Sequence, residues 1–327
     1  MSDHPRDRYD LVSDAGAEAA FLDALGRGRL HHAWLLAGPE GRGKASFAYR
    51  AARRLLGAEA DPERGPLGSD PFDPVNRLIS AQSHPDLLVL ERLVEGGKQK
   101  KSISVDQARD LPDFFSKSPS QAHRRVAIVD AADDLNVNAA NALLKILEEP
   151  PADGVLFLIS HSPGRLLPTI RSRCRRLSFA PWPEMELEAL VSRRTGEGAD
   201  VARAAAAMAG GSPGQALALA SAESLEADRL ARAWVDEGLT NRAETLALAD
   251  GFRGAEGQAR FERLMERLIA IVGQRARDGA GQGARWAELW SRLSELPDRV
   301  AGLNLDRGDA LAGALSDLER TRKAAGC

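Results

Sequence analysis

The chain has 327 residues, enough for roughly two or three domains, and its 44 Lys and Arg nearly balance its 47 Asp and Glu. A near-neutral chain gives no sign of a protein that binds nucleic acid through bulk charge. The two cysteines, Cys174 and Cys327, indicate neither a disulfide framework nor a metal cluster, and no apolar stretch approaches the roughly 20 residues of a membrane span. We therefore expect a soluble cytoplasmic protein that does not contact a membrane.

The first strong pattern is a glycine-rich loop between a predicted strand, residues 33–37, and a predicted helix, residues 44–56. The loop reads Gly38-Pro39-Glu40-Gly41-Arg42-Gly43-Lys44, which is the spacing of a P-loop. Gly38, Gly41 and Gly43 would let backbone N–H groups surround phosphate oxygens at the helix N-terminus. Lys44 would reach the β- and γ-phosphates of a nucleotide. An incidental glycine turn is the alternative interpretation.

The residue after Lys44 does not fit a working magnesium site. Ala45 stands where the motif carries Ser or Thr, whose hydroxyl binds magnesium. Ser46 follows, but one step along a helix turns a side chain by about 100°, so we expect it to face away from the position of Ala45.

The middle of the first half continues the alternation of strands and helices. Residues 57–74 are rich in Gly, Pro, Asp and Glu and are predicted to form an exposed loop, and residues 96–101 a flexible basic turn. A strand is predicted at residues 86–90 and a helix at residues 105–116.

The next strand, residues 125–129, ends in Asp130, which matches the acidic strand of a P-loop protein. Asp130 can hold a water-bridged metal, or cap the following loop or helix. Ala131 stands where an ATPase needs a group that activates water, and losing a general base commonly costs about 10²–10⁴ in rate. Asp133 and Asp134 are interpreted as loop carboxylates at the start of the next helix. The site is therefore predicted to accept ATP or ADP without efficient hydrolysis; a purely structural loop remains the alternative.

The remaining elements complete a parallel α/β domain and then an all-helical region. A helix at residues 138–148 and strands at 155–159 and 175–179 follow, and all five apolar runs are interpreted as central strands covered on both faces. Ala180-Pro181-Trp182-Pro183 interrupts the pattern. Helices are predicted at 184–195 and 200–209, another after residue 214, and the chain from about residue 221 is helical. The predicted domains are residues 1–180, 181–221 and 222–327.

Several segments together resemble bacterial clamp-loader subunits of the AAA+ superfamily. The resemblance covers about residues 20–220, and the last hundred or so residues match only as a helical region of suitable size. It implies a P-loop (AAA+) domain with a parallel sheet, a small helical lid domain and an all-α C-terminal collar domain. The segments that carry it are Arg29–Pro39, Ser83-His84-Pro85-Asp86, Ser104–Arg109, Asn141–Pro151 and Thr169-Ile170-Arg171-Ser172-Arg173-Cys174.

Within this family the chain is more similar to an accessory subunit than to the ATP-hydrolysing gamma/tau subunit. The hydrolysing subunits keep Thr, Glu and a sensor Arg at the positions of Ala45, Ala131 and Gly214. The Ser-Arg-Cys motif is intact, so the resemblance implies that Arg173 is an arginine finger for the ATP of a neighbouring subunit. A guanidinium suits this role because it is always charged and forks onto phosphate oxygens. The alternative is an ordinary solvated basic edge, since exposed charge is usually only solvated.

The resemblance also implies partners: a heteropentamer with gamma/tau and delta subunits, held in part by the collar, which opens the sliding clamp and places it on primer–template DNA. Lys98, Lys100 and Lys101 could face DNA, although a solvated loop is the default interpretation. The two rival functions are a gamma/tau-like ATPase that hydrolyses its own ATP and a stand-alone P-loop kinase. The kinase lacks support because no acceptor-binding motif or lid arginine cluster is evident.

No structural zinc is expected. Many relatives carry a four-cysteine zinc module between the P-loop and the acidic strand, and this chain has no cysteine there. His84 is interpreted as a turn or packing histidine. His31 and His32 are neighbours in the sequence, and on a strand their side chains would face opposite sides.

Overall fold

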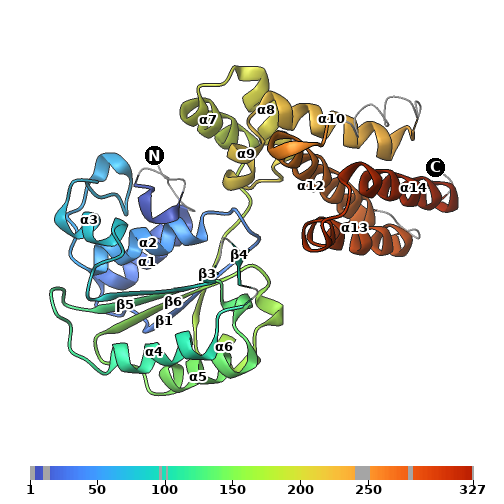
Figure 1. The fold of residues 1–327 in the computed structure, drawn as a ribbon. Helices are drawn as coiled ribbons and strands as arrows, with labels where there is room; N and C mark the ends of the chain where they lie inside the picture. Colours follow the sequence, from blue (N-terminus) through green and yellow to red (C-terminus); the bar gives the residue numbers. More distant parts are fainter. Residues whose placement is uncertain are drawn as a thin grey trace. The chain divides into compact units, whose positions relative to one another are not determined.

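A computed structural model describes residues 4–9, 15–95, 98–100, 102–239, 251–278 and 283–325 (Figure 1). The chain divides into two compact units, residues 1–190 with 209–216, and residues 191–208 with 217–327. The first unit is the expected α/β domain and the second is helical, which confirms the predicted fold class. The division into three domains at residues 180 and 221 stays a prediction.

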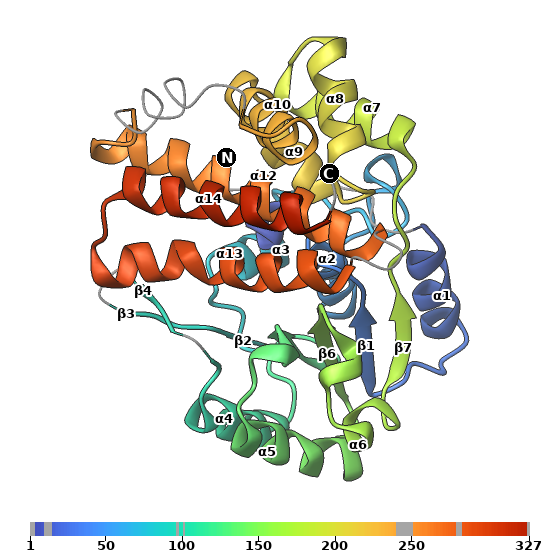
Figure 2. The ribbon, with the colours of Figure 1, turned by 90° about the vertical axis from the view of Figure 1, so that its right-hand side faces the viewer.

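The first unit is built on a five-stranded sheet with the strand order β2-β5-β6-β1-β7, and every pairing within it is parallel. Figure 2 shows β1 between β6 and β7. A two-stranded antiparallel ribbon, β3 with β4, lies apart from this sheet. The strands are β1 (Ala33–Ala37), β2 (Leu87–Glu91), β3 (Val94–Glu95), β4 (Lys98–Gln99), β5 (Arg125–Asp130), β6 (Gly154–Ser160) and β7 (Arg175–Ser178).

Two of the five strands are not central, contrary to the prediction. β2 and β7 are the edges of the sheet, and most of their residues are partly or fully exposed. Arg175 and Arg176 of β7 are exposed, and charged side chains of this kind protect a sheet edge from pairing with another chain. An apolar run therefore identified the strands, but only the pairing determined which of them are covered on both faces.

Helices cover both faces of the sheet, with α1, α2 and α3 on one side and α4, α5 and α6 on the other (Figure 1). Successive residues of a strand point to opposite faces. Trp34 and Leu36 of β1 accordingly join one buried cluster, while Leu35 joins the other. The helices are α1 (Ala15–Gly26), α2 (Lys44–Leu55), α3 (Pro74–Ser80), α4 (Val105–Phe115), α5 (Val137–Glu148) and α6 (Pro168–Arg171), and the 3₁₀ turns are η1 (Pro5–Asp7), η2 (Pro62–Arg64), η3 (Ala132–Asp134) and η4 (Pro163–Arg165).

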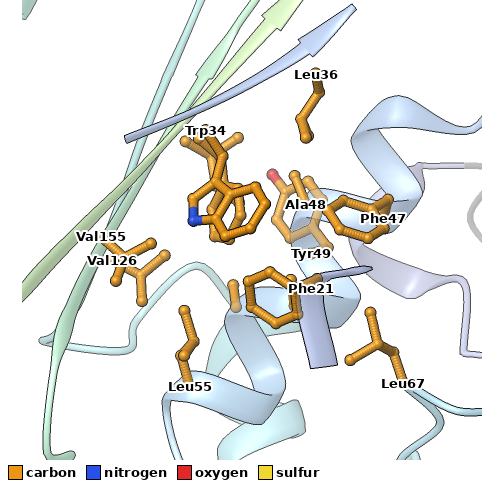
Figure 3. Close-up of a cluster of buried hydrophobic side chains, with 14 of the residues drawn as sticks. Phe21, Trp34, Leu36, Phe47, Ala48, Tyr49, Leu55, Leu67, Val126 and Val155 are labelled. Carbon is orange, nitrogen blue, oxygen red and sulfur yellow. The ribbon is translucent and has the colours of Figure 1, made fainter. Parts of the chain in front are cut away.

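Aromatic rings fill the space between α1, α2 and the sheet (Figure 3). The Phe21 ring meets Trp34 and Phe47 edge-on, with centroids 5.4 and 5.7 Å apart. Pairs of this geometry contribute about 0.5–1.5 kcal/mol beyond their buried area. This cluster fixes the position of α2, and with it the N-terminus of that helix at Lys44.

The segment predicted as an exposed loop at residues 57–74 is exposed only in part. Leu67 packs into the same aromatic cluster, and the buried Asn76 donates from Nδ2 to Ser69 Oγ at 2.9 Å. Asp73 accepts a hydrogen bond from the Val75 N–H and begins α3. Its polar composition therefore reflects turns and a helix cap rather than full exposure.

A single buried carboxylate organises the loop before β5. Asp86 has no exposed surface, and it accepts backbone N–H groups from Ser120 at 2.7 Å, Gln121 at 2.7 Å and Ala122 at 3.0 Å. Arg125 lies 3.6 Å away and is itself 8% exposed. The Asp of the Ser-His-Pro-Asp segment thus has a structural role in fixing the start of β5.

The second unit is helical, and α12 packs against α10 and α13. Apolar residues from Phe261 to Val272 are buried in its core, whereas Trp290 is 44% exposed. Asp228 and Arg267, both buried, form an ion pair at 2.7 Å. The remaining helices are α7 (Glu184–Thr195), α8 (Ala199–Met208), α9 (Pro213–Leu219), α10 (Ala222–Asp236), α12 (Gly254–Asp278), α13 (Gly283–Leu303) and α14 (Arg307–Ala325). Among the described residues, no helix combines the length and apolar character needed to cross a membrane.

Candidate functional site

The glycine loop connects the C-terminal end of β1 with the N-terminus of α2. Gly38, Gly41 and Gly43 have φ angles of 151°, 74° and 83°, in the region that favours glycine. Gly43 is the residue before the first turn of α2, and the Gly38 N–H donates to the Ser160 carbonyl at 3.2 Å. The loop therefore has the tight backbone path that its glycine spacing predicts.

Lys44 is turned back onto its own loop. The side chain is 3% exposed, and Nζ donates to the Gly38 and Pro39 carbonyls at 2.7 and 2.6 Å. Burial lowers the pKa of Lys44 to about 8, although the nearby carboxylates of Asp130 and Glu40 oppose this change. The ammonium group is thus held by neutral carbonyl oxygens in a poorly solvated position.

A cavity of about 210 Å³ lies beside the loop, and Lys44, Ala45, Ser46 and Asp130 all line it. The volume is below the range of about 300–1,000 Å³ that is usual for ligand pockets. Ser46 reaches this cavity although the helical step predicted that it would face away. Burial raises the pKa of Asp130, and the neighbouring His161 and Lys44 oppose that shift.

Pro5, Arg8 and His161 also line this cavity and were not among the predicted site residues. His161 directly follows β6, so its place after an apolar strand at the same sheet edge was the available signal. No comparable signal marked the N-terminal segment. That segment is fastened to α2 by buried arginines: Arg50 donates to the Tyr9 carbonyl at 2.6 Å, and Arg53 lies 4.1 Å from the Tyr9 ring centroid.

The segment at residues 209–216 packs directly on the glycine loop. The Gly214 N–H donates to the Gly41 carbonyl at 3.0 Å. A Cβ atom on Gly41 would collide with the Ser212 hydroxyl, and one on Gly214 would lie 3.1 Å from the Gly41 Cα. Gly214 therefore contributes backbone where a hydrolysing relative is expected to contribute an arginine side chain.

Arg42 fastens this segment to the loop. Its side chain is 8% exposed, and its two terminal nitrogens donate to the Gly211 carbonyl at 2.8 Å and the Gly210 carbonyl at 2.9 Å. Hydrogen bonds to a charged group contribute about 1.5–3 kcal/mol each. A residue that the motif leaves variable thus has a structural function here.

We expect Arg42→Ala to release residues 209–216 from the glycine loop, because both carbonyls lose a charged donor. The free energy for local opening should fall by about 3–6 kcal/mol, at about 1.5–3 kcal/mol for each of the two hydrogen bonds, and hydrogen exchange at the Gly214 amide would measure the change. The exposed Arg27, which pairs with Asp23 on α1, provides the matched control as Arg27→Ala. Unchanged protection of Gly214 would contradict the bracing role of Arg42.

The carboxylates after β5 have separate partners. Asp133 accepts hydrogen bonds from the Ser160 hydroxyl at 3.0 Å and the His161 N–H at 2.6 Å, so it joins the ends of β5 and β6. It lies in the 3₁₀ turn η3 rather than at the start of α5, as the sequence had suggested. Asn136, not Asp130, caps α5. Ala131 is buried and carries no group that could orient water.

Arg173 lies between α6 and β7, away from this cavity's lining. Its Nη1 donates to the Thr169 carbonyl at 3.1 Å, and its Nη2 lies 3.0 Å from Glu148 Oε1. The side chain is 36% exposed. Its neighbours differ from it, since Arg171 and Arg176 are more exposed and Arg175 lies over the Trp34 ring. Arg173 is therefore held in place, unlike a side chain of a freely solvated basic edge.

The predictions for the three histidines His31, His32 and His84 have different outcomes. The rings of His31 and His32 stack with centroids 4.4 Å apart, so the expectation that they face opposite sides is wrong, because both residues precede β1. His84 is buried and its Nδ1 accepts the Asp86 N–H at 3.1 Å, which confirms a turn histidine. In the part of the chain that the structure describes, no three His, Cys, Asp or Glu side chains group as metal ligands would.

The predicted basic turn is described only in part. Lys100 pairs with Glu95 at 2.9 Å, which favours a solvated loop over a surface reserved for DNA. Lys101, the Lys98 side chain and Cys327 lie outside the described residues. Cys174 packs against the buried cluster that contains Ile146 and Ile170, and burial raises the pKa of its thiol to about 12.

Comparisons with known proteins give a consistent family. Residues 15–183 match a family described as DNA polymerase III, delta subunit. The chain is 41% identical to DNA polymerase III subunit delta' of Pseudomonas aeruginosa over 60% of its length, and 36% identical to that of Escherichia coli over 61%. It is 35% identical to the gamma/tau subunit of Mycobacterium tuberculosis over 58% of this chain and 31% of that protein. The match spans 58% of the length of each of the two delta' relatives.

Among solved structures, a gamma subunit-related protein of Thermotoga maritima aligns with 92% of this chain and 100% of its own, with a TM-score of 0.49 and 19% identity.

Proposed function

The chain belongs to the DNA polymerase III delta subunit family, and on this premise we propose that it is an accessory subunit of a clamp loader, of the delta' kind. It assembles with gamma/tau and delta subunits, and the complex places the sliding clamp on primer–template DNA. The chain supplies Arg173 to the ATP site of a neighbouring subunit and turns over little ATP itself. The names of its delta' and gamma/tau relatives support these partners.

The observation that carries this proposal is the composition of the cavity beside the glycine loop. Ala45 and Gly214 line the same cavity as Lys44 and Asp130. Phosphoryl transfer needs a loop hydroxyl and a carboxylate for magnesium, together with a group that orients the attacking water. The hydroxyl at position 45 and a side chain at position 214 are both missing, and Ala131 follows Asp130. Such a site holds ATP or ADP, if at all, without efficient hydrolysis.

The position of Arg173 supports action on another chain's nucleotide. Arg173 lies just before β7, and the first residue of β7 pairs with Trp34 near the start of β1. The glycine loop begins after Ala37, at the other end of β1. A strand rises about 3.3 Å per residue, so roughly 10 Å or more of strand separates Arg173 from the glycine loop. An arginine at the opposite end of these strands from the glycine loop is poorly placed for its own loop, and its surface position suits contact with a neighbour.

ATP hydrolysis by the purified chain and by the reconstituted complex tests the proposal. We expect little turnover by the chain alone, and turnover by the complex that depends on the presence of this chain. Robust hydrolysis without partners would contradict the accessory role. Co-purification with gamma/tau and delta subunits would test the assembly itself, and failure to assemble would reject the partners.

One observation favours the second candidate, a gamma/tau-like ATPase. Ser46 lines the cavity with Asp130, so a hydroxyl and a carboxylate lie near Lys44 despite Ala45. If these two groups hold magnesium, the purified chain hydrolyses ATP and Ser46→Ala abolishes that activity. No hydrolysis by the wild-type chain removes this candidate.

Lys44→Ala is expected to affect nucleotide binding by this chain and to leave the finger function unchanged. A fluorescent ATP analogue should bind the wild-type chain more tightly at pH 7 than at pH 9, because the pKa of Lys44 is about 8 and its positive charge is lost above that value. The variant should bind weakly at both pH values. No binding by the wild-type chain at millimolar analogue would indicate a purely structural loop.

A further inference from the structure

Glu148 occupies a position at which a helix disfavours acidic side chains. It is the last residue of α5, and the C-terminal end of a helix carries a partial negative charge that favours cations. Nothing about helix formation therefore explains this carboxylate. Its contact with Arg173 does explain it, because Oε1 of Glu148 lies 3.0 Å from Nη2 of Arg173.

The guanidinium of Arg173 is held from two sides. Glu148 contacts Nη2, and the Thr169 carbonyl accepts a hydrogen bond from Nη1 at 3.1 Å. One contact leaves a planar guanidinium free to swing, whereas contacts to both terminal nitrogens fix the direction of its plane. They engage two of the five N–H donors of an arginine, so the group keeps donors for phosphate oxygens.

The backbone that carries this pair is firmly anchored. Ile146 and Leu147, which precede Glu148, are buried in the core cluster, and Ile170 of α6 belongs to the same cluster. A functional side chain supported by rigid, packed elements is positioned more accurately than one on a loop.

We propose that Glu148 is a positioning residue for the arginine finger. Its carboxylate, together with the Thr169 carbonyl, holds Arg173 in the orientation that meets the phosphates of the neighbouring subunit's ATP. This inference rests on the proposed action of Arg173 on a neighbour. The two side chains are 36% and 52% exposed, and a pair this exposed shifts an equilibrium by only about two- to fivefold. Glu148 therefore has a modest effect on the orientation of Arg173, and Arg173 itself contacts the phosphates.

The test compares Glu148→Gln with the wild type in the reconstituted clamp loader. We expect kcat at the neighbouring ATP site to fall about two- to fivefold, with KM unchanged, because the finger acts in the transition state. The thermal stability of the chain should not fall, since the change removes a carboxylate from a helix C-terminus. Glu148→Asp should recover part of the rate. Glu149→Gln, at the next exposed residue, is the matched control and should leave kcat unchanged.

A double variant separates this inference from the function on which it rests. If Glu148 acts through Arg173, Glu148→Gln adds nothing in an Arg173→Ala background. A further loss in that background would overturn the positioning role, as would an unchanged or raised kcat for Glu148→Gln alone while Arg173→Ala lowers it. If Arg173→Ala itself has no effect, the proposed finger function fails instead.

Discussion

Arg173→Ala is expected to slow ATP hydrolysis at the neighbouring subunit about 10³-fold or more, because arginine fingers contribute about 10³–10⁵ in rate where they have been measured. The guanidinium of arginine combines a permanent positive charge with a forked array of donors, and alanine has neither. Single-turnover hydrolysis measures the effect best, in a complex whose remaining ATPase subunits carry inactivated P-loops. The loss then reports on one site and is not diluted by the others.

The fold of the Arg173→Ala variant should be intact. Its pair with Glu148 is surface-exposed at 36% and 52%, and exposed pairs contribute about 0–1 kcal/mol. Arg176→Ala, an exposed arginine on β7, removes the same charge from the same surface and should leave the rate unchanged. Equal losses in both variants would indicate a general electrostatic effect and not a finger.

Asp86→Ala is expected to lower the free energy of unfolding of the α/β unit by about 3–5 kcal/mol, the usual cost of removing one partner of a buried charged pair. The carboxylate has no exposed surface and accepts three backbone N–H groups from residues 120–122. Alanine leaves those N–H donors without their acceptor and the buried Arg125 without its carboxylate partner. Urea denaturation followed by circular dichroism would measure the loss as a lower midpoint.

The contribution of Asp86 should also depend on pH. Burial raises the pKa of Asp86, but the three N–H donors and Arg125 outweigh burial and leave the pKa below its ordinary value. The unfolded chain, with a pKa of about 3.9, then binds more protons than the folded chain as the pH falls. The stabilisation is complete above that value and is lost as pH falls through the folded pKa, so wild type and variant should converge in acid.

Asp106→Ala is the control for this series. Asp106 is 82% exposed and pairs with Arg109 on the surface of α4, so its loss should change stability by about 0.5 kcal/mol or less. If Asp86→Ala is as mild as this control, the loop before β5 must be held by other contacts.

The five strands of the parallel sheet were predictable to within about one residue, because apolar runs flanked by breakers identify buried strands without knowledge of the fold. The ribbon strands β3 and β4 were not predicted, and β4 lies within the segment predicted as a flexible turn. Three helices of this unit, α1, α3 and α6, were not predicted, and the sequence carries signals for the first two. Ala17, Phe21 and Ala24 of α1 recur at helical spacing, and all three are buried. Asp73 followed by Pro74 is a typical helix start, but the polar composition of the preceding residues concealed it.

Other features depended on pairing and packing. The exposed character of β2 and β7 follows from their places at the ends of the strand order. The stacking of His31 on His32 follows from their position ahead of β1. Strand order is not encoded in a local pattern, because it depends on which distant segment pairs alongside.

The sequence by itself determined the glycine loop, the position of Lys44 and the absence of a hydroxyl at Ala45, because these depend on residue type and on spacings of a few residues. Only the tertiary structure placed Gly214 on Gly41 and Glu148 against Arg173. These contacts join segments far apart in the chain. Local spacing fixes backbone dihedrals and helix faces, whereas such contacts exist only after the parallel sheet has set the order of its strands.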